Sequence, residues 1–292
     1  ATAAQVIIRY SYAKDGGSID ITGTKTDVEN YWDKIKHLFV LESIDDVHVP
    51  IKFHYKTNYA KSFIEQTIAP LWHDIRDNYS KKTKEALDQL AQLTPEMCGG
   101  RIILLQGPPG TGKTYAIRAL SLIWEKWARI NYLIDTEAVF NDVSYLMDIL
   151  SDEDRMDEIE EDADTWDIFI IEDVDNLISL DSVDRTKGSF SRLLNLTDGL
   201  LGQGTKMLFL LTTNEPIEKI HPAISRPGRC LANITFSTLT PLEVDEWFAS
   251  KGNLEYKTKK SMTISECYQV LTSGTHIKNI IEEKKIGFRN DT

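Results

Sequence analysis

The sequence is poor in cysteine, with only Cys98, Cys230 and Cys267 among its 292 residues. They are scattered and odd in number, so they form neither a metal-binding spacing nor a disulfide framework, which fits a reducing cytoplasm. No apolar run approaches the roughly 18 residues that a membrane-spanning helix needs, and no N-terminal signal pattern is visible. These absences predict a cytoplasmic protein without a membrane span.

Basic residues are also scarce: 33 lysines and arginines face 45 aspartates and glutamates, so the formal net charge is -12. Affinity for a phosphate backbone comes from Lys and Arg, and we therefore do not expect a nucleic-acid partner. The negative charge is concentrated in residues 152–164, where nine carboxylates and Arg155 sum to -8. We interpret this block as a solvated loop, with a docking site for a basic partner as the alternative.

A glycine-rich stretch organises the rest of the chain. It follows a short apolar run, precedes a helix-like segment, and consists of Gly107, Pro108, Pro109, Gly110, Thr111, Gly112, Lys113 and Thr114. Strand, glycine-rich loop and helix in this order are the context of a phosphate-binding P-loop. The pattern predicts that the backbone N–H groups cradle a phosphate, that Lys113 reaches the β- and γ-phosphates, and that Thr114 ligates Mg²⁺.

Two adjacent acids, Glu172 and Asp173, end an apolar strand 60 residues further on. Phosphoryl transfer needs an acid near the Mg²⁺ ion, and hydrolysis needs a carboxylate that orients or deprotonates water. Beside a P-loop we interpret the pair as catalytic; alone it would be a solvated strand end. Asn214 ends the next strand and is a candidate to bind the attacking water or the γ-phosphate, with a turn-initiating role as the alternative.

Two arginines, Arg226 and Arg229, flank a Pro-Gly turn still later in the chain. A guanidinium held on a rigid turn suits phosphate recognition. Because both residues lie far along the chain from the P-loop, they are candidates to reach the nucleotide of a neighbouring subunit. Ordinary surface salt bridges are the alternative.

Together these motifs resemble the AAA+ ATPases over about residues 96–292. The match includes 107–114, 168–173, 192–199, 212–214 and the segment from Pro222 to Arg229. The Glu-Asp-Val-Asp and Thr-Thr-Asn forms are similar to the Bcs1-like branch, and other parts resemble uncharacterised bacterial and phage AAA ATPases.

The resemblance implies an α/β fold: a P-loop NTPase parallel sheet with strand order 5-1-4-3-2. The pattern of predicted elements adds a small helical C-terminal lid and an N-terminal α+β module. It further implies ATP and Mg²⁺ as cofactors, with Thr114 and Glu172 on the metal side and Asp173, Glu172, Asn214, Arg226 and Arg229 as catalytic residues. A homo-oligomer, usually a hexameric ring acting on a protein client, is also implied.

Four departures from the family pattern affect these expectations. The stretch from Asn214 to Arg226 is one residue longer than in the commoner pattern, so the choice between Arg226 and Arg229 as the trans residue stays open. The C-terminal lid is short and lacks an evident sensor-2 arginine. The family's usual order of the strand-end acids is Asp-Glu, whereas here Glu172 takes the metal-side place and the shorter Asp173 the catalytic one. The aromatic pore loop expected after the second strand is not recognisable; Phe140 is the nearest candidate, and core packing is at least as good an interpretation.

Alternating apolar strands and helices predict an open parallel sheet after residue 96, and short helices follow Pro241. Thr240 with Glu243, and Thr263 with Glu266, have the spacing of capping boxes that open two of these helices. We expect an N-terminal α+β module over residues 1–95, a nucleotide-binding core over 96–238 and a helical lid over 239–292. Within the first part, residues 5–24 read as a hairpin, Val47 to Tyr55 as a strand, and 58–93 as helix interrupted at Pro70.

Three functions remain open from the sequence. The first is an ATP-hydrolysing remodeller whose N-terminal module selects a protein client. The second is an assembly module that binds ATP with negligible turnover, because Asp173 is one methylene shorter than glutamate. The third, a nucleic-acid loader, is disfavoured by the acidic balance.

Overall fold

The computed structural model of the chain describes residues 7–13, 16–35, 47–150, 165–178, 206–220, 224 and 228–273. The chain divides into two compact units, Ala1–Asp46 and Val47–Thr292. The predicted helix at 190–198, the helical stretch at 275–285, the acidic block and Arg226 lie outside the described residues.

The larger unit is built on a seven-stranded sheet with the order β4-β3-β6-β7-β8-β5-β9. Its strands are β3 (His48–Lys56), β4 (Ala60–Ile68), β5 (Ile102–Gln106), β6 (Ala128–Leu133), β7 (Trp166–Ile171), β8 (Met207–Thr213) and β9 (Cys230–Thr235). All neighbouring strands run parallel except the β3–β4 pair, which is antiparallel. From β9 to β6 the order is 5-1-4-3-2, which confirms the P-loop sheet expected from the resemblance.

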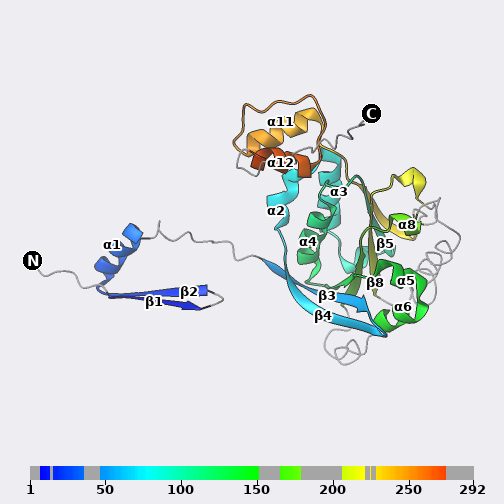
Figure 1. Cartoon of the computed structure of the whole chain (residues 1–292), viewed down its shortest axis with the longest axis horizontal. Helices are drawn as coiled ribbons and strands as arrows, with labels where there is room; N and C mark the ends of the chain where they lie inside the picture. The colour runs from blue at the N-terminus through cyan, green and yellow to red at the C-terminus, as the bar shows by residue number, and fades with distance from the viewer. Residues whose placement is uncertain are drawn as a thin grey trace, which may run out of the picture. The chain divides into compact units, whose positions relative to one another are not determined.

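The central strands are apolar and buried on both faces, as parallel strands between two helical layers must be. Alternate residues of β5 therefore enter two separate clusters, Ile103 and Leu105 on one face and Ile102 and Leu104 on the other. Helices cover both faces (Figure 1). They are α2 (Trp72–Ile75), α3 (Lys81–Ala91), α4 (Lys113–Trp124), α5 (Thr136–Asn141), α6 (Val143–Leu150) and α8 (Asp175–Ile178), with short 3-10 turns η2 (Arg76–Asn78), η3 (Pro95–Met97) and η4 (Ile217–Lys219).

The structure corrects the first predicted boundary. Residues 47–95 do not form a module with residues 1–46 but belong to the same compact unit as the P-loop. The strand β3, predicted from Val47 to Tyr55, pairs with β6 through Ile51–His54. Pro50 lies just before this paired stretch, so a residue without an N–H is tolerated in a strand that has neighbours on both sides.

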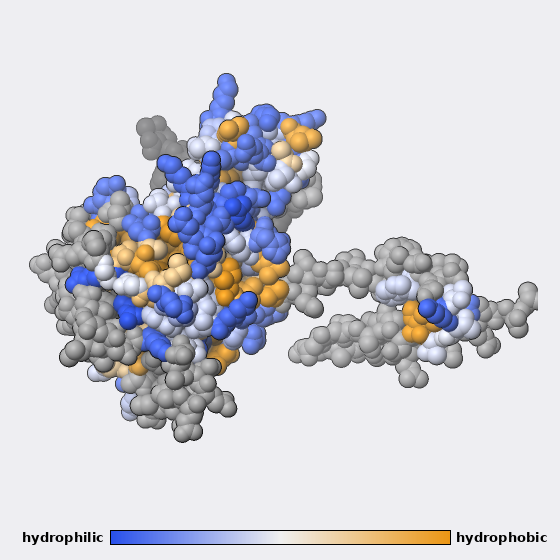
Figure 2. Space-filling view, turned by 180° about the vertical axis from the view of Figure 1, so that it is seen from behind, coloured by the Kyte–Doolittle hydropathy of each residue, from blue (hydrophilic) through white to orange (hydrophobic). Residues whose placement is uncertain are grey.

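The helix predicted from residue 58 is wrong over its first part. Ala60–Ile68 is the strand β4, which pairs with β3 along its whole length, from His48↔Ile68 to Lys56↔Ala60. Its Ala, Lys, Glu and Gln residues favour helix, but pairing with an existing sheet overrides this weak preference. As an edge strand, β4 exposes three large apolar side chains, Phe63, Ile64 and Ile68. Figure 2 shows apolar patches on the otherwise hydrophilic surface.

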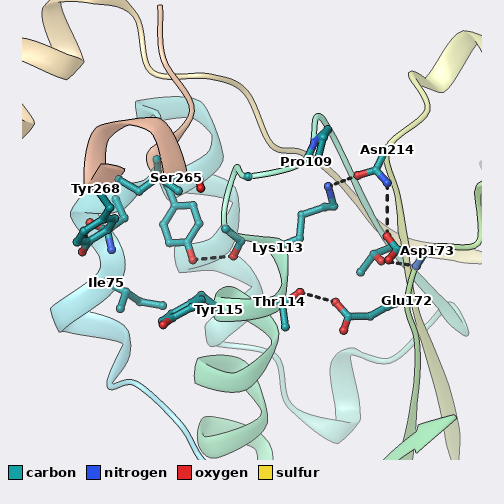
Figure 3. Close-up of a pocket in the computed structure, with 16 residues that line it drawn as sticks. Ile75, Pro109, Lys113, Thr114, Tyr115, Glu172, Asp173, Asn214, Ser265 and Tyr268 are labelled. Carbon is teal, nitrogen blue, oxygen red and sulfur yellow. Dashed lines mark hydrogen bonds between the residues drawn. The ribbon is translucent and has the colours of Figure 1, made fainter. Parts of the chain in front are cut away.

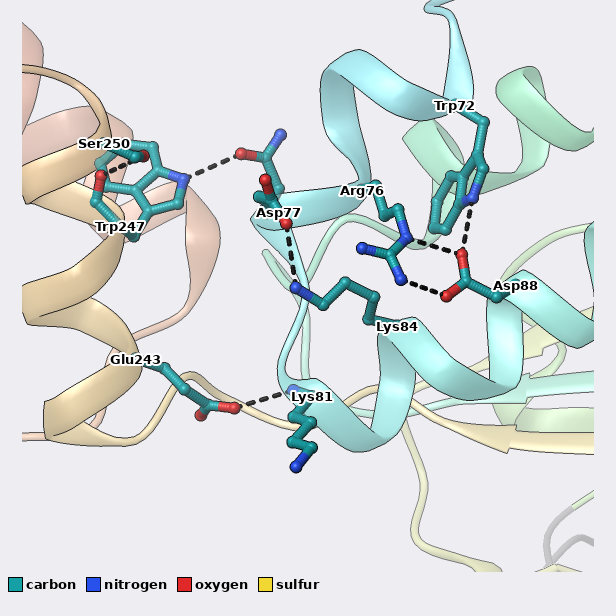
Figure 4. Close-up of polar contacts among 10 residues, drawn as sticks. Trp72, Arg76, Asp77, Lys81, Lys84, Asp88, Glu243, Trp247 and Ser250 are labelled. Carbon is teal, nitrogen blue, oxygen red and sulfur yellow. Dashed lines mark hydrogen bonds and ion pairs between the residues drawn. The ribbon is translucent and has the colours of Figure 1, made fainter.

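Helix formation resumes after Pro70, as predicted, in α2 and α3. The two are held together by Asp88 of α3, whose carboxylate accepts hydrogen bonds from Arg76 at 2.6 and 2.8 Å and from the Trp72 indole at 3.0 Å (Figure 4). The Arg76 guanidinium holds the pKa of Asp88 below its usual range. This cluster fixes the segment that leads into Asn78 and Tyr79.

The smaller unit contains the predicted hairpin, β1 (Ile7–Ala13) and β2 (Gly16–Thr22), paired antiparallel. It is followed by the helix α1 (Lys25–Ile35), which begins after Thr24, whose hydroxyl accepts a hydrogen bond from the backbone N–H of Asp27. A side-chain oxygen at this position satisfies one of the free donors of the first helical turn.

After β9, two helices form a small separate core. Both begin with the predicted capping boxes: Thr240 with Glu243 opens α11 (Pro241–Ser250), and Thr263 with Glu266 opens α12 (Ile264–Ser273). In each box the threonine hydroxyl and the glutamate carboxylate satisfy backbone donors reciprocally. The apolar faces of the two helices pack together around Trp247, Phe248 and other buried side chains.

Phe140, the pore-loop candidate, is only 2% exposed and packs in the cluster on the α5–α6 face of the sheet. Of the two interpretations given above, core packing is the correct one. Over the part of the chain that the structure describes, no helix is long and apolar enough to cross a membrane.

Candidate functional site

The loop of residues 107–114 connects β5 to α4 and requires its glycines. Gly107 has φ of 147°, and a Cβ atom there would lie 2.2 Å from the carbonyl oxygen of Phe236. Gly112 has φ of 92° and lies against the ring of Tyr79, whose hydroxyl donates to the Gly112 carbonyl at 3.1 Å. Side chains at these positions would clash or strain the backbone, so the tight curl depends on glycine.

Lys113, the first residue of α4, is 8% exposed. Its ammonium donates to the carbonyl oxygens of Gly107 at 2.6 Å and Pro108 at 3.2 Å, and to Asn214 Oδ1 at 2.8 Å. Burial lowers the pKa of Lys113, while nearby carboxylates act in the opposite direction. The amine is therefore held at the mouth of the loop among oxygen acceptors, which is where a phosphate would meet it.

Glu172 follows the last residue of β7, and both of its carboxylate oxygens accept hydrogen bonds. Thr114 Oγ1 donates to Oε1 at 2.7 Å, and the Tyr132 hydroxyl donates to Oε2 at 3.0 Å. Burial raises the pKa of Tyr132 well above its usual range, and the neighbouring Glu172 adds to the shift. Tyr132 therefore stays protonated and remains a donor. The contact with Thr114 joins the two residues that the sequence placed on the metal side.

Asp173 is exposed, and its backbone N–H donates to Thr212 Oγ1 at 2.9 Å. Asn214 lies between this acid and the lysine: its Oδ1 accepts from Lys113, and its Nδ2 lies 3.4 Å from Asp173 Oδ1. Because the ammonium can only donate, the amide orientation of Asn214 is defined. The predicted strand-end residues thus meet in one polar cluster.

Asp175, at the start of α8, holds Asn214 in place through hydrogen bonds. Its carboxylate accepts from the backbone N–H of Asn214 at 2.6 Å, from Asn214 Nδ2 at 3.0 Å and from the Thr213 hydroxyl at 2.5 Å. Burial alone would raise the pKa of Asp175, but the hydrogen bonds from Thr213 and Asn214 outweigh it and lower that pKa. Asp175 is therefore a carboxylate at neutral pH.

Lys113, Thr114, Glu172, Asp173 and Asn214 line a cavity of about 680 Å³, within the usual range for small-molecule sites. Figure 3 shows its two ends: Lys113, Glu172, Asp173 and Asn214 form the polar end, and apolar or aromatic side chains form the other. The second end includes Ile75, Tyr115 and Tyr268, and Tyr79 and Ile264 also line the cavity. A planar base at the apolar end and phosphates at the polar end match this division.

The helix α12 forms part of the cavity wall next to the P-loop. The backbone N–H of Ser265 donates to the carbonyl of Gly110 at 3.0 Å, so α12 contacts the P-loop directly. Asn78, which lines the same cavity, accepts from the indole of Trp247 at 2.9 Å and from the hydroxyl of Tyr268 at 3.4 Å. Both helices of the C-terminal pair are thereby tied to the wall of the cavity.

The structure brings together the P-loop, Glu172, Asp173 and Asn214, as the sequence predicts. Arg229 is not among them: it precedes β9, and its carbonyl accepts from the N–H groups of Arg101 and Ile102 at the opposite edge of the sheet. Several residues of the site had not been identified from the sequence, among them Tyr79, Asn78, Tyr132 and Asp175. Of these, only Asp175 had a signal, as the last acid of the Glu-Asp-Val-Asp run.

The chemistry of the donor set fits Mg²⁺ with a nucleoside triphosphate. Magnesium is usually held by one or two protein oxygens, with water and phosphate oxygens completing its shell. Thr114 and Glu172 supply such a pair, and the described residues contain no cluster of three His, Cys, Asp or Glu that would form an all-protein metal site. Sheet order, loop, buried lysine and strand-end acids together define a P-loop NTPase.

Comparison with known proteins narrows this class. Residues 103–238 match the family described as ATPase family associated with various cellular activities (AAA). The probable mitochondrial chaperone bcs1 of Schizosaccharomyces pombe is 32% identical over 150 residues, which are 50% of this chain and 30% of that protein. An AAA-ATPase of Arabidopsis thaliana is 32% identical over 151 residues, 47% of this chain and 30% of its own length.

The ATPase family gene 2 protein of Schizosaccharomyces pombe is 35% identical over 134 residues, 44% of this chain and 15% of that protein. The chain thus spans no more than 30% of the length of these three relatives. Residues 103–238 thus match the AAA ATPase family, and this part of the chain is similar to the Bcs1-like branch.

Proposed function

We propose that the chain binds ATP with Mg²⁺ in the cavity beside Lys113 and hydrolyses it. The observation that carries this proposal is the 2.7 Å contact between Thr114 and Glu172, next to a buried lysine on a P-loop. Lys113 pairs with the β- and γ-phosphates, and the backbone of residues 107–114 surrounds them. Thr114 and Glu172 hold the Mg²⁺ ion, which neutralises phosphate charge.

Asp173 is the general base of this proposal. The oxygen of a water molecule forms a bond to the γ-phosphorus while the bond from that phosphorus to the bridging oxygen breaks, and Asp173 takes the proton from the water. Asn214 has donor and acceptor atoms between Lys113 and Asp173, so it can hold the water in line. The products are ADP and inorganic phosphate.

We propose that Arg229, and Arg226 beside it in the sequence, serve the nucleotide of an adjacent subunit. Arg229 lies at the start of β9, beside Arg101 and Ile102, whereas the P-loop follows Gln106 at the other end of β5. Five residues of strand separate the two edges by roughly 16 Å. This separation favours a role in trans, in a homo-oligomer that we propose to be a hexameric ring.

We further propose that the oligomer remodels or assembles a protein partner. The support is likeness: one relative is named a chaperone, and the domain belongs to the AAA family. The three cysteines are free, which suits a reducing compartment such as the cytoplasm. Residues 1–46 form a compact unit of their own and are our candidate for selecting the client.

A phosphate-release assay with Lys113→Ala tests the hydrolysis. Loss of the ammonium should remove most of the turnover, whereas Lys126→Ala, an exposed lysine just beyond the end of the same helix, should retain it. Equal rates in the wild-type and Lys113→Ala proteins would exclude hydrolysis in this cavity.

The second candidate, an ATP-dependent assembly module with negligible turnover, is favoured by one observation. The acid at the catalytic position is the shorter Asp173, and it is exposed at the strand end. Measuring the mass of the particle in solution with ATP and with ADP, alongside phosphate release, separates the two functions. Assembly that depends on ATP without phosphate release would support the second.

A further inference from the structure

Glu172 occupies the metal-side position, where the family usually has aspartate. Its side chain is one methylene longer than that of aspartate, so its carboxylate can adopt more orientations. A carboxylate on a longer stem has an additional rotatable bond, so it needs more contacts to stay in one place. The structure supplies two, Thr114 Oγ1 on Oε1 and the Tyr132 hydroxyl on Oε2. Only the first of these belongs to the P-loop.

Under the function proposed above, Mg²⁺ binding affects the Thr114 and Tyr132 contacts with Glu172 differently. The Thr114 hydroxyl is the group expected to ligate Mg²⁺, so its hydrogen bond to Glu172 gives way to the metal. The Tyr132 hydroxyl has no such second task, and its bond to Oε2 can persist with the metal in place. Carboxylate ligands are commonly held by such hydrogen bonds, and their loss weakens metal binding by 10- to 100-fold.

We propose that Tyr132 is a positioning residue that holds the Glu172 carboxylate in the orientation that binds Mg²⁺. The inference rests on the proposed function, because it concerns the metal of the same site. Tyr132 acts through Glu172 and does not line the cavity itself.

Tyr132 is itself held in place by neighbours on two strands. It pairs with Ile170 of β7 and Phe53 of β3, so it is anchored on both sides within the sheet. Its ring packs against Phe53, with centroids 5.4 Å apart, and Phe53 stacks on Phe63 of β4, also at 5.4 Å. The β3–β4 hairpin thus supports the ring whose hydroxyl reaches Glu172.

The test is Tyr132→Phe, which removes the hydroxyl and keeps the ring. Binding of a fluorescent ATP analogue is titrated with Mg²⁺, and binding is also measured in EDTA. We expect the Mg²⁺ concentration for half-maximal effect to rise about tenfold, while binding in EDTA is unchanged. Tyr145→Phe is the matched control, because the Tyr145 hydroxyl is buried with no hydrogen-bond partner in the described part of the chain and lies outside the cavity.

A Glu172→Gln background separates positioning from general loss of structure. If Tyr132 acts through the carboxylate, adding Tyr132→Phe to Glu172→Gln should produce no further shift in Mg²⁺ dependence, whereas independent effects would add. The comparison remains valid if Tyr132→Phe lowers the stability of the fold. Glu172→Gln and the Glu172→Gln/Tyr132→Phe double variant are then both measured under conditions in which they are folded.

The outcomes are distinct. A wild-type protein whose ATP binding does not respond to Mg²⁺ would end the proposed function and this inference with it. A wild-type protein that does respond, with a Tyr132→Phe titration that superimposes on it, would overturn the positioning role alone. Equal shifts in Tyr132→Phe and Tyr145→Phe would overturn it as well.

Discussion

Asp173 has φ of 55°, the one non-glycine residue with a positive φ in the part of the chain that the structure describes. Asp and Asn are the residues that most readily adopt this left-handed conformation. The bend at the end of β7 lets Glu172 and Asp173 have different partners, Thr114 and Tyr132 for the first and Asn214 for the second. Two adjacent acids can therefore divide the metal and base roles.

Asp173→Asn should abolish turnover and leave ATP binding intact. Asparagine tolerates the same backbone conformation and can make similar hydrogen bonds, but it cannot accept the proton of the water. Loss of a general base lowers the rate by about 10²- to 10⁴-fold. Phosphate release and nucleotide titration measure the two effects, with Asp148→Asn, at an exposed position on α6, as the control. Undiminished hydrolysis in Asp173→Asn would assign the base elsewhere.

The residues predictable from the sequence are those fixed by a local motif at a strand end. Lys113 sits in its loop, and Glu172 and Asn214 follow buried strands whose carboxyl ends meet at one edge of the sheet. Tyr132 could not be predicted, because its contact with Glu172 depends on the pairing of β6 with β7. Asn78 likewise acquires its role only when the C-terminal helices dock.

At the scale of elements, the predicted lid of α11 and α12 is hydrogen-bonded to Gly110, Lys81 and Asn78 of the core. Ser265 N–H donates to the Gly110 carbonyl, and the Trp247 indole donates to Asn78. The Glu243 carboxylate accepts from Lys81 N–H at 2.8 Å (Figure 4). Two of these contacts involve residues of the cavity, Gly110 and Asn78. Nucleotide binding and lid docking therefore share part of their contacts and should stabilise each other.

Trp247→Phe should weaken ATP binding by about 2- to 10-fold. The substitution removes the indole donor to Asn78, a hydrogen bond contributing roughly 0.5–1.5 kcal/mol, and keeps an aromatic ring in the small core of α11 and α12. Trp124→Phe is the control: its indole N–H is buried with no hydrogen-bond partner among the described residues, and the smaller ring leaves a cavity in the core. That variant should lose stability without a comparable loss of affinity. Affinity by nucleotide titration and stability by thermal unfolding separate the cases; unchanged affinity in Trp247→Phe would contradict the shared contact.

Elements were predictable where the sequence pattern and the final environment agree. The strands of the core are continuous apolar runs, and the capping boxes at Thr240 and Thr263 are local signals that the structure confirms. The strand β4 was missed because its sequence favours helix and exposes most of its side chains, so no buried face produced a period of two. Its conformation is set by β3, which no local pattern reveals.

At the scale of the molecule, the P-loop and Arg229 lie at opposite ends of the parallel strands. The P-loop follows the carboxyl end of β5, and Arg229 lies beside its amino end. One protomer then offers a nucleotide-binding edge and an arginine-bearing edge, which is the requirement for a head-to-tail contact that closes into a ring. The boundary between the two compact units, after Asp46, also concerns the whole molecule. The β3–β4 hairpin extends the sheet beyond the five strands expected from the family, and no local sequence pattern indicates that it belongs to the core.

Mixing two inactive variants tests this arrangement. Arg229→Ala has an intact P-loop but no guanidinium at that position, and Lys113→Ala has the reverse, so each supplies what its neighbour lacks at a shared interface. With random 1:1 mixing, one interface in four pairs an intact P-loop with an intact arginine, and phosphate release should recover to about a quarter of the wild-type rate if each interface works independently. The Lys113→Ala/Arg229→Ala double variant, mixed with either single variant, creates no complete interface and should give no recovery. Since Arg226 lies three residues away, the same mixing with Arg226→Ala identifies which arginine is required. No recovery with either arginine variant would mean that each protomer completes its own site.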